Sequence, residues 1–346
     1  MRISPPPHRV VARFCAQSLE ECAKVSSVVA LNEANIRKWA PLLVLIAVCV
    51  GFGLINPNFL SIRNFARIGV LAAPALLVAI GVTFIIIMGS IDLSMEGVVT
   101  FCAVIFATIF RALGGTMFEG WLGILAALAV GVLAGLITGI AHVKLRIPSF
   151  MASLSMGFVG AGAVVILSGG YRITIDDPVF RSLLTTRFIG MPLMVHFAIV
   201  MTAVAWFIQK HTVIGRNIYA VGGGEDLAKA SGLNTERVRI IGFALAGLFY
   251  ALGSLLAVAR VGIADGQSGS NLMFTSITAV VVGGTSLMGG TGGVLNTLVG
   301  VLIVSAIMNG MVVVGLPSYV QSGVLGAMVI VAVALSINRK TISLVK

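Results

Sequence analysis

Between residues 40 and 336 the chain is built mainly of apolar runs separated by short polar segments. A helix rises 1.5 Å per residue, so about twenty residues cross the ~30 Å hydrocarbon core of a membrane. The runs have this length, and they lack the alternation of period two that is typical of membrane barrels. The pattern predicts ten membrane-spanning helices, at residues 40–56, 68–90, 95–110, 121–141, 149–168, 190–208, 238–259, 271–288, 293–314 and 319–336.

The composition agrees with a membrane protein. Hydrophobic residues make up 58% of the chain and charged residues 10%, with a mean hydropathy of +1.08, whereas soluble domains carry roughly 25% charged residues. Because lipid offers the backbone no hydrogen bonds, the spans must be helices. We therefore expect an all-α polytopic protein with one membrane domain at residues 39–338, flanked by a flexible tail at 1–38 and a short tail at 339–346.

The charges predict how the chain is oriented. With the N-terminus inside, sixteen lysines and arginines lie on the cytoplasmic side, in both tails, the 144–146 turn and the 210–239 loop. The opposite side carries seven, namely Arg63, Arg67, Arg111, Arg172, Arg181, Arg187 and Arg260. This bias follows the positive-inside rule and places both termini in the cytoplasm. It also explains the net charge of +11 without a nucleic-acid partner.

The N-terminal tail lacks the uninterrupted apolar core of a signal peptide. We interpret it as a flexible cytoplasmic segment; the alternative is a helix over residues 17–39 that lies on the membrane lipid surface. Cys15 and Cys22 are too far apart for a C-x-x-C motif, and Cys49 and Cys102 fall within spans. No disulfide or metal site is expected.

Two glycine-rich interruptions break the apolar pattern. Residues 283–293 contain six glycines and three hydroxyl side chains, and residues 85–94, IIIMGSIDLS, also run from apolar to polar. Glycine lets the backbone leave helical geometry, and nearby hydroxyls can satisfy the freed polar groups. Interruptions in corresponding halves of a membrane protein are typical of a transport pathway built from repeats. We therefore predict two glycine-broken segments beside a passage.

A third glycine pattern has a different interpretation. Gly131, Gly135 and Gly139 recur every four residues on one face of a predicted span. Small residues at this spacing let a neighbouring helix approach closely. We predict a packing face there, with a substrate groove as the alternative.

Several polar residues within the spans are candidates for the passage. Asp92 is the strongest single candidate, because a carboxylate at the end of a span needs water, a helix N-terminus or a basic partner. With Ser94 it could cap the next helix, or it could contact substrate directly. The full candidate set is Asp92, Ser94, Asn271, Ser276, Thr285, Ser286, Asn309 and Gln321.

The sequence offers no catalytic or nucleotide motif. No lysine follows a glycine, as a phosphate-binding loop requires, and the glycine stretch does not complete G-x-G-x-x-G. H-E-x-x-H and G-x-S-x-G are also absent from the sequence. We expect no enzyme and no cofactor in this chain. A transport protein and a non-transport scaffold or membrane receptor remain. A self-contained ion-coupled carrier would need several acids or histidines deep in the spans.

The longest polar segment between spans, residues 210–239, predicts a partner surface. Residues 225–231 are predicted to form a short helix. Glycines precede it, and Gly232 can end it. Leu227 and Ala230 lie three apart and form one small apolar face, while Glu225, Asp226 and Lys229 are expected to face water. An ordinary solvated loop is the alternative.

Three motifs together carry a resemblance to a known family. GSIDLS at 89–94, GRNIYAVGGGEDLAKASGLN at 215–234 and AVVVGGTSLMGGTGG at 279–293 resemble the permease subunits of ribose-type bacterial ABC sugar importers. The resemblance covers residues 39–338 in the same order. It implies a multi-pass protein of the bacterial inner membrane that translocates a monosaccharide or related small sugar.

The same resemblance implies three protein partners. They are a second permease copy or a sister permease, a periplasmic sugar-binding protein, and a separate ABC ATPase subunit that binds ATP and Mg. The short helix would be the coupling helix that seats in a cleft of the ATPase. The coupling residues implied are Gly215, Glu225, Asp226, Leu227, Ala230, Ser231 and Gly232.

Two positions depart from the family pattern. Met273 and Thr275 stand where family members usually carry an acidic pair, and Glu96 is inserted ahead of Gly97. The role of the acidic pair is therefore lost or relocated in this chain, and the sugar stays open.

Overall fold

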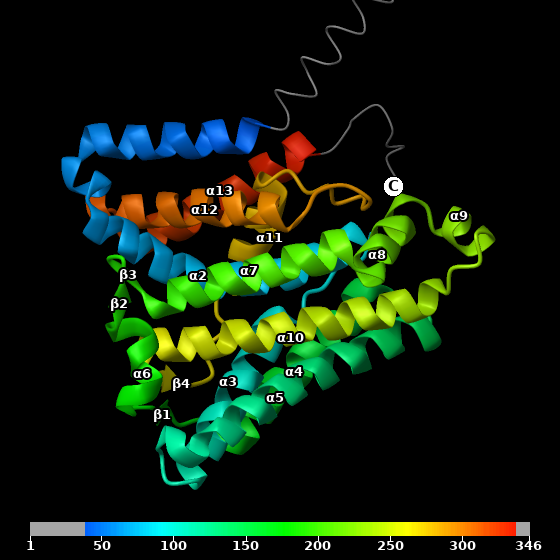
Figure 1. Ribbon diagram of the computed structural model, residues 1–346, viewed down its shortest axis with the longest axis horizontal. Helices are drawn as coiled ribbons and strands as arrows, with labels where there is room; N and C mark the ends of the chain where they lie inside the picture. Colours follow the sequence, from blue (N-terminus) through cyan, green and yellow to red (C-terminus); the bar gives the residue numbers. More distant parts are fainter. Residues whose placement is uncertain (1–38, 337–346) are drawn as a thin grey trace, which may run out of the picture.

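The computed structural model describes residues 39–336, and these are mostly helical (Figure 1). Within these residues, seven helices are long and apolar enough to cross a membrane. They are α2 (Ile62–Ile87), α3 (Met95–Ala112), α4 (Met117–Lys144), α5 (Ser149–Ser168), α7 (Leu193–His211), α10 (Thr235–Val261) and α12 (Val294–Val314). Three shorter apolar helices are the first one, Trp39–Ile55, α11 (Leu272–Val282) and α13 (Ser318–Ser336). The predicted tails and Cys15 and Cys22 lie outside the described residues.

The remaining elements are short and lie at the two ends of the bundle. Helices α8 (Val213–Gly223) and α9 (Glu225–Ala230) form one end, and η1 (Pro57–Leu60) and α6 (Pro178–Thr185) lie at the other (Figure 1). Two-residue strands β1 (Ile173–Thr174) and β4 (Ile263–Ala264) pair antiparallel there, as do β2 (Arg187–Phe188) and β3 (Met191–Pro192).

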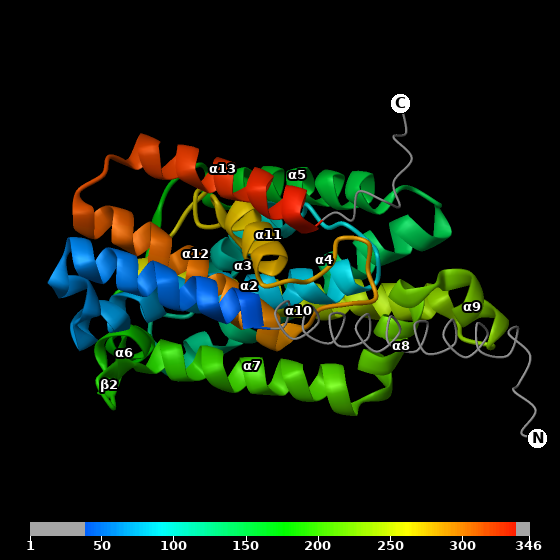
Figure 2. The ribbon, with the colours of Figure 1, turned by 90° about the horizontal axis from the view of Figure 1, so that it is seen from above.

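Helix α2 forms the centre of the core. Almost every residue from Ala72 to Met88 is buried, and α10, α12, α7 and α11 pack around it. Figure 1 shows three layers, with the first helix and α11–α13 above, α2, α7 and α10 in the middle, and α3–α5 below; Figure 2 shows the upper layer from above. Small residues such as Ala75, Ala79 and Gly81 let the neighbouring helices approach α2 closely. Hydropathy alone does not set this position, because α4 is nearly as apolar and is for the most part not buried.

The glycine stripe on α4 packs against α10, as the sequence predicts. A Cβ atom on Gly131 would overlap the carbonyl oxygen of Gly247, and one on Gly135 would overlap that of Phe243. The two helices therefore approach with backbone against backbone. In lipid such close packing replaces the hydrophobic effect as the source of helix association.

Large apolar side chains are exposed on the outer helices. Examples are Leu133 on α4, Phe158 and Ile166 on α5 and Phe207 on α7. Exposed apolar area of this extent is unusual for a soluble monomer and suits a surface that contacts lipid.

Both predicted helix interruptions are confirmed. Helix α2 ends at Ile87 and α3 begins at Met95, while α11 ends at Val282 and α12 begins at Val294. The predicted span at 271–288 is therefore too long by six residues. Gly284 has φ +93°, a left-handed conformation that stops the helix and that glycine adopts readily.

Candidate functional site

Three glycine-containing segments from distant parts of the chain meet at the end of the bundle that carries α8. The Gly290 N–H donates to the Ile87 carbonyl at 2.9 Å. A Cβ on Gly222 would overlap that same carbonyl oxygen, and one on Gly289 would lie 2.9 Å from the Gly89 nitrogen. We call this contact of residues 87–89, 222–223 and 289–290 the glycine junction. Both broken segments therefore touch one another and the end of α8.

Hydroxyl groups close the loop at 283–293. Thr285 is buried, and its Oγ1 accepts from the Gly293 N–H at 3.3 Å. The Ser286 N–H donates to the Thr291 carbonyl at 3.2 Å, and Ser286 Oγ accepts from the Met288 N–H at 3.2 Å. The two hydroxyls satisfy backbone groups freed by the broken helix, as the sequence suggested.

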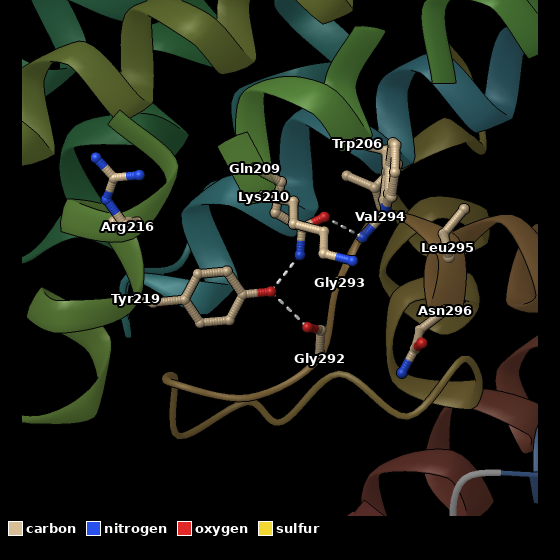
Figure 3. A pocket seen from close by; sticks show the side chains of 10 residues that line it. All are labelled: Trp206, Gln209, Lys210, Arg216, Tyr219, Gly292, Gly293, Val294, Leu295 and Asn296. Atoms are coloured by element: carbon tan, nitrogen blue, oxygen red, sulfur yellow. Dashed lines mark hydrogen bonds between the residues drawn. The ribbon is translucent and has the colours of Figure 1, made fainter. Parts of the chain in front are cut away.

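A cavity of about 550 Å³ lies beside this loop, between α7, α8 and the start of α12 (Figure 3). Tyr219 donates to the Gly292 carbonyl at 2.6 Å and accepts from the Gln209 amide. Gln209 Oε1 accepts from the Val294 N–H at 2.9 Å. These bonds fasten the end of the glycine loop to α7 and α8, so the three elements are linked.

Asp92 is buried, and both of its carboxylate oxygens accept hydrogen bonds. Its Oδ1 accepts from the Ser94 N–H at 2.8 Å and from Ser94 Oγ at 2.6 Å. Its Oδ2 accepts from the Tyr250 hydroxyl, on α10, at 3.0 Å. The two bonds from Ser94 close a turn just before α3, but the N-cap residue of α3 is Ser94, which makes no side-chain cap hydrogen bond, so Asp92 precedes the helix without capping it. Nothing in the apolar pattern of α10 marked Tyr250 as its partner.

Helix α9 projects from the same end of the bundle (Figure 1). Leu227 is 77% exposed and Ala230 is exposed beside it, while Ala228 faces inward and is buried. The predicted small apolar face is therefore present. Asp226 is exposed, Ser231 forms the C-cap, and Gly232 follows with φ +83°. Gly215 lies in the first turn of α8, where a Cβ would overlap the Gln209 carbonyl oxygen.

Glu225 corrects one expectation, because its side chain does not simply face water. Its Oε1 lies 2.9 Å from Lys229 Nζ and its Oε2 lies 2.7 Å from Arg239 Nη2. The hydrogen bond from Lys229, followed by the bond and the charge of Arg239, lowers the pKa of Glu225 to about 2. The carboxylate therefore stays ionised and joins α9 to α10.

Arg239 extends this connection to the first broken segment. Its side chain is 14% exposed, and its Nη1 donates to Ser90 Oγ at 2.6 Å. A cavity of about 550 Å³ lies alongside, lined in part by Ser90, His142, Arg146 and Glu225. We call the chain Glu225–Arg239–Ser90 the α9 link. It places one guanidinium between the short helix and the segment that follows α2.

The other predicted passage residues are spread through the fold. Asn309 Nδ2 donates to Asn64 Oδ1 at 2.9 Å, which ties α12 to α2. Gln321 Nε2 donates to the Leu316 carbonyl at 2.9 Å. Asn271 precedes α11 with φ +65°, and the buried Ser276 Oγ has no hydrogen-bond partner within residues 39–336. The structure does not gather the eight candidates into a single site.

The two departures from the family pattern lie next to each other. Glu96 Oε1, at the start of α3, accepts from the Met273 N–H, at the start of α11, at 3.4 Å. The sequence did not predict this contact, because the two residues are far apart along the chain. It places an acid at the α11 N-terminus although residue 273 itself is not acidic.

The comparisons with known proteins agree with this architecture. Residues 64–333 match the family described as branched-chain amino acid transport system / permease component. The ribose import permease of Haemophilus influenzae is 33% identical over 301 residues, covering 86% of this chain and 91% of that protein. The L-arabinose ABC transporter permease of Azospirillum brasilense is 32% identical over 80% of each chain. The galactose/methyl galactoside import permease of Escherichia coli is 31% identical over 90% of this chain and 96% of its own length. The chain therefore belongs to this transport-system permease family, and its resemblance is to permeases of ABC sugar importers.

Proposed function

We propose that the chain is the transmembrane subunit of an ABC importer and translocates a monosaccharide or a related small sugar. A periplasmic binding protein delivers the sugar, and a separate ATPase subunit binds ATP and Mg and supplies the energy. The chain itself has no catalytic site and no cofactor, and it works as a dimer with a second copy or a sister permease. The sugar-permease relatives and the family match support this general role.

In this proposal ten helices cross the bacterial inner membrane and both termini are cytoplasmic. The long helices from α2 to α10 run in alternating directions in Figure 1, and the short α11 lies between α10 and α12, which run in the same direction. The end that carries α8 and α9 also carries Lys144, Arg146, Lys210, Arg216 and Lys229. The positive-inside rule assigns that end to the cytoplasm, which is where an ATPase would meet it.

The observation that carries the coupling proposal is the position of α9. It exposes Leu227 and Ala230 at the end of the bundle where the two broken segments meet. When ATP closes the ATPase dimer, α9 moves with it, and the α9 link pulls on the segment after α2. The passage then alternates between outward-open and inward-open states. Switching between two packings needs only small shifts at such a contact.

An ion-coupled carrier is the alternative class, and two observations favour the ABC importer over it. The relatives are ABC transporter permeases, and the buried Asp92 already has three hydrogen bonds from protein groups. A carboxylate engaged in this way is a poor candidate for a site that binds and releases a driving ion.

The coupling proposal is tested by Ala230→Trp, with Ala230→Ser as the matched control at the same position. The indole adds bulk to the exposed face of α9 and should block docking, whereas serine keeps the small volume. The measurements are co-purification of the ATPase and sugar-stimulated ATP turnover in vesicles that contain the binding protein. We expect the tryptophan variant to lose both and the serine variant to keep both. Wild-type values for both variants would show that α9 is not the coupling element.

A further inference from the structure

Arg260 is a cation without a partner near the outer end of the passage proposed above. It is half-buried in the last turn of α10, and within residues 39–336 its guanidinium makes no hydrogen bond or ion pair. The helix end does not need it as a cap. Arg181 Nη1 donates to the Ala259 carbonyl at 3.2 Å, and the Ile175 N–H donates to the Gly262 carbonyl at 2.8 Å.

Arg260 lines a cavity of about 280 Å³ at the end of the bundle opposite α9. Helices α2 and α10 and the loop that leads into α11 form its walls, with Pro74, Arg260 and Ser270 among the lining residues. This is the side from which a binding protein would deliver substrate. Within residues 39–336 no protein group accepts from the five N–H groups of this half-buried guanidinium, so they are open to water or to a ligand in the cavity.

The carboxylate in the cavity wall, that of Asp265, is already engaged. Asp265 Oδ1 accepts from the Gln267 N–H at 2.9 Å and from Ser268 Oγ at 3.4 Å. Asp265 Oδ2 lies 3.3 Å from Arg172 Nε. The wall loop is thus closed by its own hydrogen bonds, and its carboxylate pairs with Arg172, whose side chain is 74% exposed, and not with Arg260.

The cavity therefore has an excess of donors and of positive charge. Arg172 and Arg260 face one acid, Asp265, among the lining residues, and Gln267 Oε1 already accepts from Ser270 Oγ at 2.6 Å. A neutral sugar offers Arg260 only uncharged hydroxyl oxygens as acceptors. A carboxylate offers acceptors only, and it matches the planar fork of a guanidinium.

We propose that this cavity is a substrate subsite for a monosaccharide that carries a carboxylate, a sugar acid, and that Arg260 binds the carboxylate. Arg260 is then a specificity-determining residue of the permease. The inference rests on the proposed import function, since it names the substrate class for the same passage.

The test is saturation-transfer NMR with the full-length permease in lipid nanodiscs, with D-glucuronate and D-glucose as probes at equal concentration. Arg260→Met removes the charge and keeps a long side chain, and Arg260→Lys restores a cation without the fork. Arg187→Met is the control, because Arg187 is an exposed arginine at the same end, in β2 and outside the cavity. Size-exclusion profiles identify any variant that has lost its fold.

We expect saturation transfer to D-glucuronate and little to D-glucose. The apparent affinity for D-glucuronate should fall roughly tenfold or more in Arg260→Met, recover partly in Arg260→Lys and stay unchanged in Arg187→Met. Equal transfer to both sugars, transfer to neither, or a D-glucuronate signal that survives Arg260→Met in a folded variant would overturn the inference. ATP-dependent uptake of a neutral sugar by the complete importer, without preference for the sugar acid, would overturn it and leave the import function standing.

Discussion

At the scale of single residues, the glycines of the junction are required by close approach, and not all of them by backbone conformation. Gly289 and Gly290 have φ +88° and +71°. Gly222, in contrast, is helical within α8, and a Cβ there would lie 2.7 Å from the Gly290 nitrogen and would also overlap the Ile87 carbonyl oxygen. The next residue, Gly223, has no atom within 4 Å of the corresponding position. The two neighbours therefore provide a matched pair.

Gly222→Ala should destabilise the folded protein by about 1–3 kcal/mol, because overpacking forces the backbone segments apart. Gly223→Ala should be neutral or slightly stabilising, since alanine favours helix over glycine. Thermal unfolding in detergent, followed by loss of helical circular dichroism, measures both. Equal melting temperatures for the two variants would contradict the close contact at the junction.

Glu225 gives a prediction about pH. Its folded pKa of about 2 is below the ordinary value of about 4.3 for an unfolded chain. The ion pairs therefore contribute stability that is fully present above the unfolded pKa and is lost as the pH falls through the folded pKa. The contribution is modest because the side chain is partly exposed.

The difference in melting temperature between wild type and Glu225→Gln checks this sign. It should be constant above about pH 5 and shrink between about pH 4.5 and about 2. A difference that grows as the medium becomes more acidic would mean that Glu225 is not held ionised by Lys229 and Arg239.

At the scale of elements, the α9 link gives a prediction about coupling. Arg239→Met keeps an unbranched, flexible side chain but removes both the bond to Glu225 and the bond to Ser90. Docking of the ATPase should survive, since the exposed face of α9 is unchanged. The movement of α9 should be transmitted less efficiently to the segment after α2, so fewer sugar molecules should be imported for each ATP hydrolysed.

Arg237→Met is the matched control, because Arg237 is exposed two residues earlier and its side chain makes no hydrogen bond or ion pair within residues 39–336. The measurement is the ratio of sugar uptake to ATP turnover in vesicles that contain the complete importer. We expect this ratio to fall several-fold in Arg239→Met only. If both variants keep the wild-type ratio, the link does not carry the coupling.

The elements show how far a sequence predicts local structure. Apolar run length located the long helices well, because about twenty apolar residues in lipid have no alternative to a helix. The predicted span at 190–208 begins late as a helix, at Leu193, because residues 187–192 form the small β2–β3 hairpin. The predicted span at 271–288 ends early, at Val282. Hydropathy does not distinguish a helix from an apolar turn at such ends.

At the scale of the whole molecule, the sequence predicted two broken segments but not that they touch. The contact between Gly290 and Ile87 joins residues about two hundred positions apart. A single sequence does not indicate which distant residues lie close together in space. For the same reason the sequence did not predict that Tyr250 bonds to Asp92 or that Arg239 bonds to Glu225. Polar residues in spans could be found as candidates, but their partners depended on how the helices pack.

If the chain is a transport subunit driven by a separate ATPase, its activity must depend on that partner. The most direct measurement is sugar uptake and ATP turnover in proteoliposomes that contain the purified permease, with and without the ATPase and the binding protein. We predict that the permease alone hydrolyses no ATP and accumulates no sugar, and that the complete set accumulates sugar only with ATP. ATP turnover by the pure chain, or sugar accumulation by the permease alone under an ion gradient, would contradict the claim.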